Sequence, residues 1–278
     1  METSTPPPGP PWDLPVHDAP LAFVDLEMTG LDPTRDHVVE VCIERWRGES
    51  REGVLESLVR PPTRAGGSAH IHGIDEAALM AAPAFDALAD DVDRLLSGAV
   101  FVAHAAQYDA MFICAEMKRA GRAFAIDHTI DTLVLSRRAF ALPSHSLTSL
   151  CTHLGILRGR AHRAGDDVRA LRAVFERCVA VLAPTSARDL WEVRVAERHA
   201  RAAILSACVA AAGGSVPVEI VYRPTRRAAH ALTMMVTEVC AALDPPRVLG
   251  YLLPGRGRRE LRADRILRVG PIVEQENR

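Results

Sequence analysis

Residues 21–30 have the sequence LAFVDLEMTG, and this stretch decides the fold. Four apolar residues begin a run that is typical of a buried strand, and the chain turns at Thr29-Gly30. Side chains at positions i and i+2 of a strand project from the same face, so Asp25 and Glu27 point together. Two neighbouring carboxylates raise each other's pKa unless a cation lies between them. The stretch predicts a strand that ends in a paired acidic site, although an exposed strand end with incidental acids has the same pattern.

The elements around this strand predict an α/β fold. Strand patterns at 37–43 and 53–59 follow after short connections, which indicates an antiparallel meander. From residue 75 onward, helical patterns alternate with apolar runs that suit strands. A meander followed by alternating helices and strands is typical of a mixed sheet with helices packed on it. The predicted helices span 84–97, 107–120, 146–154 and 165–182, and the predicted strands 99–102 and 124–126.

Composition and length indicate a globular protein of about two domains. The chain has 278 residues, of which 48% are hydrophobic and 24% charged, with a net charge of −2. No run approaches the roughly 18–20 apolar residues of a membrane helix. The start has no signal-peptide pattern. We therefore expect a cytoplasmic protein with no membrane partner. The six cysteines have no metal-ligand spacing, and we expect reduced thiols.

Breaks in the pattern divide the chain into four parts. The start is rich in proline without periodicity, which predicts a disordered tail. A Pro-Thr-Ser-Ala break at 184–187 ends the α/β pattern, and a helix up to about residue 209 then precedes strand patterns at 216–222, 232–240 and 248–253. The expected parts are a tail (1–18), an α/β domain (19–183), a linker with a helix (184–212) and a small, mainly β domain (213–278).

Two further elements carry acids at places where strands or turns meet helices. His104 and Asp109 flank the turn between an apolar strand and a helix, and His162 and Asp167 bracket the turn that opens the helix at 165–182. Each acid alone is also typical of helix capping. Oxygen ligands of this kind suit Mg²⁺ or Mn²⁺, and two such ions about 4 Å apart promote in-line displacement at a phosphodiester. The pattern predicts a two-metal site with His162 as general base; its four carboxylates are Asp25, Glu27, Asp109 and Asp167.

These motifs resemble those of the DEDDh branch of the 3′→5′ exonucleases, the DnaQ-like family with an RNase-H-like fold. The family pattern D-x-E-x-T-G stands at 25–30, H-N-A-x-F-D at 104–109 and H-x4-D at 162–167. The resemblance implies an RNase-H-like mixed sheet flanked by helices, metal-dependent hydrolysis at nucleic-acid 3′ ends, with single-stranded ends as the expected partner, and the same five catalytic residues. It also implies substrate-binding roles for the residues beside them, which are Met28, Thr29, Gly30, His104 and Tyr108.

The resemblance leaves the choice between DNA and RNA open. The family's usual Asn in the second motif is Ala105 here, which removes a hydrogen-bonding group. The stretch 25–33 resembles the oligoribonuclease version of the first motif, whereas the second motif resembles the proofreading version. We expect DNA slightly ahead of RNA as the substrate.

The last part of the chain is basic. Residues 201–278 hold 12 Arg and 7 Asp plus Glu, a balance of +5, whereas residues 1–200 carry −7. At strand spacing, the arginines of 256–265 form rows that suit phosphate contacts, or simply a solvated, charge-paired strand. The stretch 259–266 resembles the closing motif of WYL domains, which are small SH3-like β modules. That resemblance implies a nucleotide or nucleic-acid ligand; the candidate contacts are Arg259, Arg262 and Arg265.

Two functions from different classes remain. The first is a metal-dependent 3′→5′ exonuclease with an added C-terminal binding module, acting on DNA or, like the oligoribonucleases, on RNA. The second is a non-catalytic regulator that only binds nucleic acid. The presence of all four carboxylates and the histidine favours the enzyme.

Overall fold

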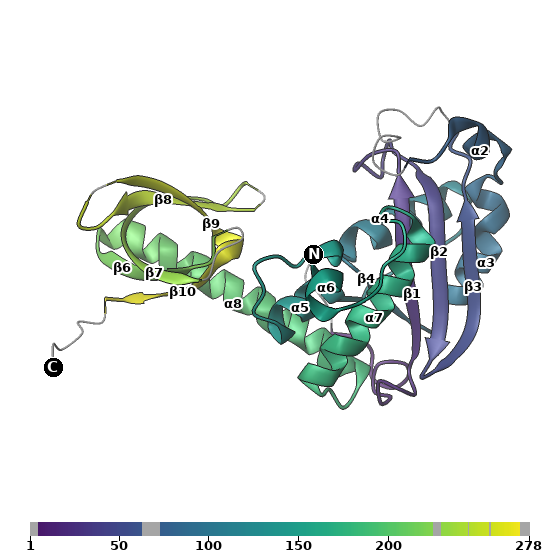
Figure 1. The fold of residues 1–278 in the computed structure, drawn as a ribbon, viewed down its shortest axis with the longest axis horizontal. Coiled ribbons are helices and arrows are strands. Elements are labelled where there is room, and N and C mark those ends of the chain that lie inside the picture. Colours follow the sequence, from purple (N-terminus) through teal and green to yellow (C-terminus); the bar gives the residue numbers. More distant parts are fainter. Residues whose placement is uncertain (1–4, 63–72, 225–228, 244, 256, 273–278) are drawn as a thin grey trace. The chain divides into compact units, whose positions relative to one another are not determined.

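The computed structural model describes residues 5–62, 73–224, 229–243, 245–255 and 257–272. The chain forms two compact units (Figure 1). The first contains residues 1–141 and 145–194, and the second contains residues 142–144 and 195–278. The first unit thus extends past the expected boundary at residue 183. No helix in the described ranges is long and apolar enough to span a bilayer.

A mixed five-stranded sheet forms the centre of the first unit, as predicted. Its strand order is β3-β2-β1-β4-β5, with antiparallel pairing among β1, β2 and β3 and parallel pairing of β4 with β1 and β5. The two central antiparallel strands are buried over most of their length because both are apolar runs. The strands are β1 (Pro20–Met28), β2 (Val38–Arg47), β3 (Ser50–Leu58), β4 (Val100–Ala103) and β5 (Thr129–Asp131).

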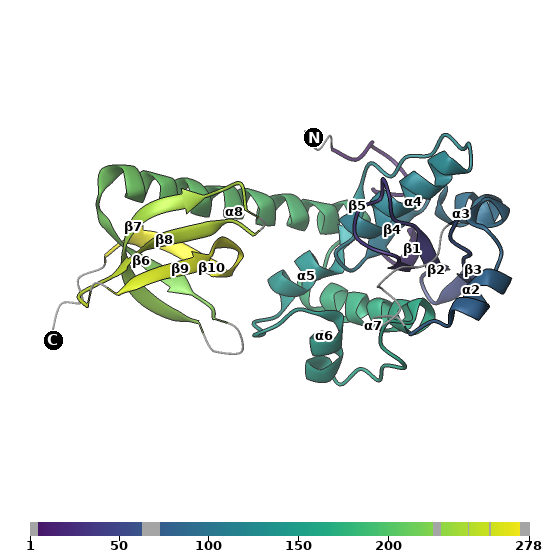
Figure 2. The same cartoon turned by 90° about the horizontal axis from the view of Figure 1, so that it is seen from above.

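Helices cover both faces of this sheet (Figure 2). The side chains of β1 alternate between the two helical layers. Val24 joins a core cluster with Phe112 of α4 on one face. Phe23 meets Phe175 of α7 on the other face, with ring centroids 5.3 Å apart. The strand alternation therefore turns Asp25 and Glu27 toward the α7 face. The helical elements are α2 (Glu76–Ala81), η1 (Phe85–Leu88), α3 (Ala89–Leu96), α4 (Gln107–Arg119), α5 (Thr132–Ala139), α6 (Leu147–Leu154) and α7 (Ala164–Leu182).

The last strand of this sheet lies later in the chain than expected. The prediction of a strand at 124–126 is wrong, because these residues form no strand. Phe124 and Ile126 are partly buried and pack on the core cluster instead. The strand is β5, whose Ile130 pairs with Val102. The helix expected at 84–97 divides into η1 and α3, and α2 and α5 were not predicted.

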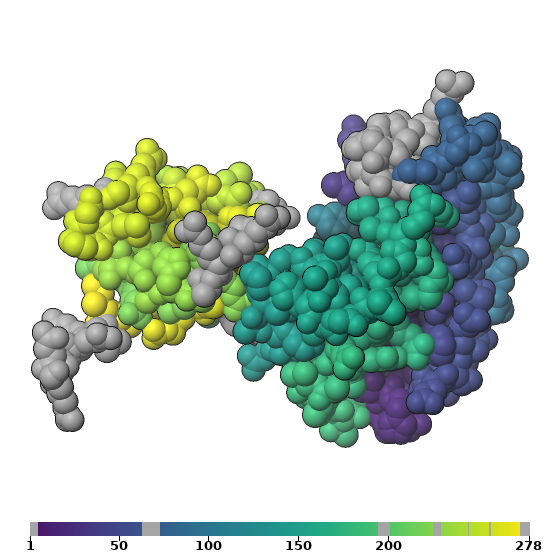
Figure 3. Space-filling view, viewed as in Figure 1, coloured from purple at the N-terminus to yellow at the C-terminus, as the bar shows by residue number. Residues whose placement is uncertain are grey.

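In the space-filling view, the teal and green surface of α5, α6 and α7 adjoins the blue surface of β2 and β3 (Figure 3).

The proline-rich start does not match the prediction of a disordered tail over 1–18. Residues 1–4 lie outside the described residues, but 5–18 pack on the first unit. Trp12 is buried, with its ring centroid 5.9 Å from that of His128. Arg188 pairs with Asp13 and donates to the carbonyl oxygens of Pro6 and Pro7 at 2.8 Å each. One large aromatic side chain and one arginine thus order a segment whose composition indicates disorder.

The second unit contains an antiparallel sheet in the order β10-β6-β7-β8-β9. The 28-residue helix α8 (Ala187–Gly214) begins in the first unit, and its later part supplies Cys208 and Ala211 to the core of the second. The arginine-rich run forms β9 only up to Arg262, because Ala263–Arg265 is a 3₁₀ turn (η2). The strands are β6 (Pro217–Tyr222), β7 (His230–Cys240), β8 (Arg247–Leu252), β9 (Arg258–Arg262) and β10 (Ile266–Pro271).

All six cysteines are free, in agreement with the expectation of reduced thiols. Four of them are buried, and Cys114 and Cys240 are half-buried. Burial raises the pKa of the Cys178 thiol to about 12 and that of Cys208 to about 11, so both stay protonated at neutral pH. These thiols act as small apolar side chains.

Candidate active site

Two carboxylates stand at the end of β1. Asp25 is half-buried and Glu27 is buried, and both face α7. In the pairing of β1 with β2, Glu27 lies directly opposite Glu40, and the register shifts after Glu27. Like charges directly opposite on neighbouring strands repel each other. Glu27 therefore needs either a proton or a nearby cation.

Asp109 comes to the same place from the first turn of α4 and is buried. The Asp109 carboxyl group accepts a hydrogen bond from the backbone N–H of Leu26, which lowers the pKa of Asp109. Leu26 lies between the two acids of β1, so Asp109 contacts that strand. Burial is nevertheless the larger effect, and together with the nearby charges of Asp131 and Glu27 it raises the pKa of Asp109 to about 8. Asp109 thus belongs to the cluster on β1 and does not serve as a solvent-exposed helix cap.

The start of α7 brings His162 and Asp167. Asp167 is buried, and one of its carboxylate oxygens, Oδ2, accepts from the backbone N–H of His162 at 3.2 Å. The His162 ring is half-exposed, with Nδ1 4.0 Å from Oε1 of Glu27. One ligand atom from each of Glu27, His162 and Asp167 lies within 4.8 Å of the other two. The backbone of His162 has φ +61°, a left-handed conformation that costs a non-glycine residue about 1 kcal/mol or more.

The electrostatics of the cluster fit a site for divalent cations. Burial, followed by the charges of Asp109, Asp167 and Glu27, raises the pKa of Asp25 well above its usual range. Burial and the charges of Asp167 and Glu40 raise the pKa of Glu27 to about 7. Carboxylates that repel each other to this extent are stabilised by positive charge. Their all-oxygen donor set is the one that hard divalent ions prefer, so the residues present fit the metal that the sequence implies.

Sequence reasoning missed a buried ion pair that holds the start of α7. Glu40 of β2 is buried, and its Oε1 accepts from Nη2 of Arg163 at 2.8 Å and from Nε at 3.0 Å. Its other oxygen, Oε2, accepts from the backbone N–H of Ala164 at 3.1 Å. Glu40 therefore caps the N-terminus of α7, whose own N-cap residue makes no side-chain cap. An acid in the middle of the apolar run VVEVCI was the signal in the sequence.

A second missed residue is Arg158, in the loop between α6 and α7. Its Nε donates to Oδ1 of Asp167 at 2.8 Å, and only 10% of its side chain is exposed. Its charge lowers the pKa values of Asp25 and Glu27, against the larger effect of burial. No motif or periodicity points to Arg158 in the sequence.

The predicted substrate-binding residues at the end of β1 lead into the tight connection between β1 and β2. The backbone N–H of Thr29 donates to the carbonyl oxygen of His37, and the Thr29 hydroxyl accepts from the His37 N–H, both at 2.9 Å. Met28 is half-buried. A Cβ on Gly30 would lie 2.3 Å from a carboxylate oxygen of Asp36, so a larger residue here would have to displace the Asp36 side chain.

The second motif is held by Asp131 and Thr132. Nδ1 of His104 lies 3.0 Å from the Thr132 hydroxyl, and burial lowers the His104 pKa. Ala105 has φ +63°, and its N–H donates to the Asp131 carboxylate at 3.0 Å. Tyr108 is 43% exposed. Asp131 thus fixes the turn that leads to Asp109.

The predicted arginine contacts of the second unit differ in their surroundings. Arg259 is exposed on β9, and no carboxylate among the described residues pairs with it. Arg262 pairs instead with Asp264, with its Nη2 2.9 Å from Oδ2. Arg265 lies on η2, so the strand row expected across 258–265 does not form.

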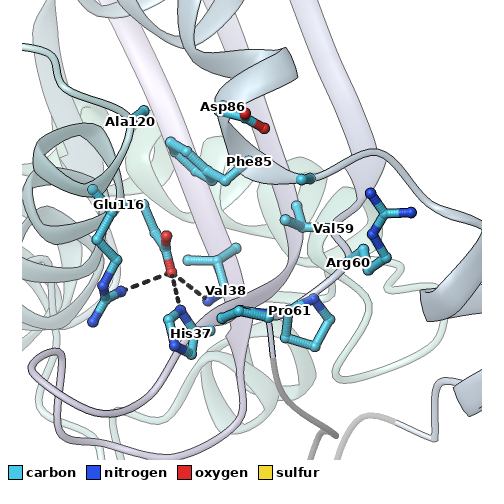
Figure 4. A pocket seen from close by; sticks show the side chains of 12 residues that line it. His37, Val38, Val59, Arg60, Pro61, Phe85, Asp86, Glu116 and Ala120 are labelled. Carbon is cyan, nitrogen blue, oxygen red and sulfur yellow. Dashed lines mark hydrogen bonds and ion pairs between the residues drawn. The ribbon is translucent and has the colours of Figure 1, made fainter.

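A separate pocket of about 370 Å³ lies beside the start of β2 and the end of α4 (Figure 4). Glu116 stands in its wall, where one oxygen accepts from Val38 N–H and Arg119 and lies 3.0 Å from Nδ1 of His37. Phe85 and Pro61 form part of its apolar lining. None of the five predicted catalytic side chains lines this pocket, so it is distinct from the carboxylate cluster.

Comparisons with known proteins identify a related family. Residues 22–175 match the family described as exonuclease. The chain is 30% identical over 178 residues to the DNA polymerase III subunit epsilon of Treponema pallidum, which covers 61% of this chain and 81% of that protein. It is 29% identical over 177 residues to the PolC-type DNA polymerase III of Thermotoga maritima, covering 63% of this chain but only 13% of that polymerase.

Among solved structures, the fold is similar to that of the zinc-bound complex of E. coli ExoI with single-stranded DNA. The TM-score is 0.54 at 18% identity, covering 84% of this chain and 54% of that one. At this identity the likeness concerns the fold. The match over residues 22–175 covers more than half of the chain and contains all three motifs. The chain therefore belongs to the exonuclease family.

Proposed function

We propose that the chain is a divalent-metal-dependent 3′→5′ exonuclease of the DEDDh type that releases mononucleotides from nucleic-acid ends. The observation that carries this proposal is the convergence of Glu27, His162 and Asp167, whose ligand atoms lie within 4.8 Å of one another. Asp25 and Asp109 join them: after burial, the charge of Asp109 raises the pKa of Asp25, and the charges of Asp131 and Glu27 raise that of Asp109. Family membership and the relationship to a polymerase III epsilon subunit support the same reaction.

In this proposal each side chain has a defined task. Asp25, Glu27, Asp109 and Asp167 hold two ions, Mg²⁺ or Mn²⁺, which supply an activated water and stabilise the leaving 3′ oxygen. His162 takes the proton of the attacking water as the bond from phosphorus to that oxygen breaks. Its ring is half-exposed, so a water at the cluster can reach it. The substrate-binding tasks at the terminal nucleotide belong to Met28, Thr29, Gly30, His104 and Tyr108.

Replacing one acid tests the assignment. Asp167→Asn keeps the shape of the side chain and removes a ligand charge, so we expect hydrolysis of an end-labelled oligonucleotide to fall by about 10³-fold. Asp166→Asn is the matched control, because Asp166 directly precedes Asp167 on α7 and accepts hydrogen bonds from Arg160 and Arg169 instead. The control should stay within about threefold of the native rate. Comparable rates for native protein and Asp167→Asn would refute the proposal.

The choice between DNA and RNA is tested with matched oligonucleotides of several lengths. We propose DNA as the preferred substrate, since two of the relatives are DNA polymerase III proteins by name. Faster release from short RNA would favour an oligoribonuclease-like enzyme. Tight binding without turnover of any 3′ end would favour a non-catalytic regulator.

For the second unit we propose a WYL-like, SH3-like module that adds phosphate contacts. Arg258 and Arg259 carry this proposal, because both are exposed on β9 and neither pairs with a carboxylate in the described ranges. Neutralising both residues should flatten the salt dependence of oligonucleotide binding by about one to two ions per molecule. An unchanged salt slope would refute this role. Because Arg262 already pairs with Asp264, Arg262→Gln should change the slope less.

A further inference from the structure

The loop between α6 and α7 directs the side chain of one arginine toward the carboxylate cluster. Leu157 is 99% exposed and Arg160 is exposed as well, whereas the side chain between them, Arg158, is only 10% exposed. An arginine side chain loses hydration when it is buried, so it needs a strong partner there. The partner is Asp167, one of the four proposed metal ligands.

The contacts of Arg158 use one carboxylate oxygen twice. Nε donates to Oδ1 of Asp167 at 2.8 Å, and Nη2 donates to the same oxygen. The remaining nitrogen, Nη1, donates to the hydroxyl of Thr148 on α6. The other Asp167 oxygen, Oδ2, accepts from the backbone N–H of His162. Every hydrogen bond of the guanidinium group that the structure describes therefore goes to Asp167 or to Thr148 on α6.

A guanidinium group and a divalent ion cannot occupy the same place on Oδ1. A Mg²⁺-sized ion needs its oxygen ligand at about 2.1 Å, and the two N–H groups of Arg158 already point at this oxygen. Two positive charges on one carboxylate also repel each other. The second buried ion pair of the site differs in this respect, because Arg163 binds Glu40, which is not a proposed ligand.

We propose that Arg158 is a resident counter-cation that competes with the divalent ion for Asp167 and so sets the metal affinity of the site. The proposal rests on the proposed function in one respect, namely that Asp167 is a metal ligand. Arg158 partly neutralises the crowded carboxylates when metal is scarce. Metal binding then requires the guanidinium group to leave Oδ1 of Asp167. Arg158 is thus a positioning residue of the metal site.

The test measures Mn²⁺ binding directly, by titration calorimetry on the full chain, with no nucleic acid present. Arg158→Gln should lower the Kd for Mn²⁺ about tenfold or more, because it removes a competing charge from Asp167. Arg160→Gln is the matched control: it removes the same charge from the same loop, but only the backbone N–H of Arg160 makes a described contact, with Asp166. We expect its Kd to change less than about twofold.

A second variant protects the test against a folding failure of Arg158→Gln. Thr148→Val removes the anchor of Nη1 from an exposed position of α6, so Arg158 should leave Asp167 more easily and Mn²⁺ should bind about two- to threefold more tightly. Thermal unfolding in EDTA adds an independent readout: Arg158→Gln should lower the Tm, and saturating Mn²⁺ should raise it more than in the native protein.

The outcomes separate the two proposals. Native protein that binds Mn²⁺, with equal or weaker binding in every variant of Arg158→Gln and Thr148→Val that folds, overturns the competition and leaves the exonuclease proposal intact. An absence of Mn²⁺ binding in native protein and in both variants overturns the metal site itself, and the competition with it. Binding that appears only once Arg158 is replaced supports the competition in its strongest form.

Discussion

Arg158 and Arg163 in the first unit each bind a carboxylate that is at least nine-tenths buried. In the second unit, by contrast, Arg247 pairs with a Glu260 side chain that is 58% exposed, and Arg268 pairs with Glu219 at the surface. The same residue type thus forms buried pairs beside the carboxylate cluster of the first unit and solvent-screened pairs at these two places of the second. Burial accounts for the difference, since water and salt weaken an exposed pair and reach a buried one much less. We therefore expect the loss of a buried pair of the first unit to cost more stability than the loss of a surface pair of the second.

The largest effect that we expect in the second unit comes from a glycine. A Cβ on Gly250 of β8 would lie 2.0 Å from the carbonyl oxygen of Met235 on β7. Gly250→Ala should therefore cost about 4 kcal/mol or more of the stability of this sheet. Gly270→Ala is the control, since a Cβ there would meet nothing within 4 Å. Urea unfolding followed by circular dichroism measures both, and equal midpoints for the two variants would contradict the packing argument.

The next effect compares one buried and one exposed acid directly. Glu40→Ala leaves Arg163 and the N-terminus of α7 without a partner and should cost about 3 kcal/mol. Glu219→Ala removes the surface pair with Arg268 and should cost less than about 1 kcal/mol. Urea unfolding gives both free energies. If the two costs were equal, burial would not explain the difference between the units.

The stability of the first unit should also depend on pH, through two of its acids. Glu27 and Asp109 have pKa values of about 7 and about 8 in the folded protein, raised mainly by burial from 4.5 and 3.8. Between those values the folded state holds protons that the unfolded chain has lost, so the free energy of unfolding falls as pH rises. In EDTA we expect a loss of about 2 kcal/mol or more between pH 5 and pH 8.

Divalent metal should reverse most of this loss at pH 8, because it binds the ionised carboxylates. The double variant Glu27→Gln/Asp109→Asn removes both titrating groups and should flatten the dependence. Thermal unfolding at several pH values measures all three cases. An equally steep dependence in the double variant would assign the loss to other groups.

The smallest effect concerns the turn before α4. Ala105 has φ +63°, a conformation that asparagine adopts more easily than alanine. Ala105→Asn should raise the free energy of unfolding by about 0.5–1 kcal/mol. Ala77→Asn, at an exposed position of α2, should lower it by about 0.5 kcal/mol. A loss of stability in Ala105→Asn would show that Asp131 or Thr132 requires the smaller side chain.

The parts of the fold that the sequence predicted have a strong local pattern. β1 is a buried apolar run and α7 repeats apolar residues at helical spacing, so the existence of both elements and the buried face of α7 were visible in the sequence. Asp25, Glu27, Asp109 and Asp167 stand at the ends of β1, α4 and α7, which is why the sequence could predict that they share one site. By contrast, β5 has only three residues, and an equally apolar run at 124–126 lies just before it.

The parts that the sequence did not predict depend on contacts of single side chains, most of them with partners far away in the chain. Glu40 and Arg163 are 123 positions apart, and nothing local tells which arginine a buried acid will bind. Arg158 lies nine positions before Asp167, in a loop without periodicity. Trp12 stands in a proline-rich start whose composition suggested disorder, yet it is buried beside His128. Long-range pairing of single side chains leaves no periodic signal in a sequence.

The ordered start of the chain has a practical consequence for anyone who shortens this protein. Trp12 packs on His128, and the His128 ring also lies 6.0 Å from that of Trp191, in the first turns of α8. Removing the first 18 residues as if they were a dispensable leader would uncover these rings and deprive Arg188 of Asp13. An affinity tag is therefore better attached ahead of Pro6 than substituted for the segment, and a truncated product that aggregates would reveal its exposed aromatic surface rather than a defect of the catalytic domain.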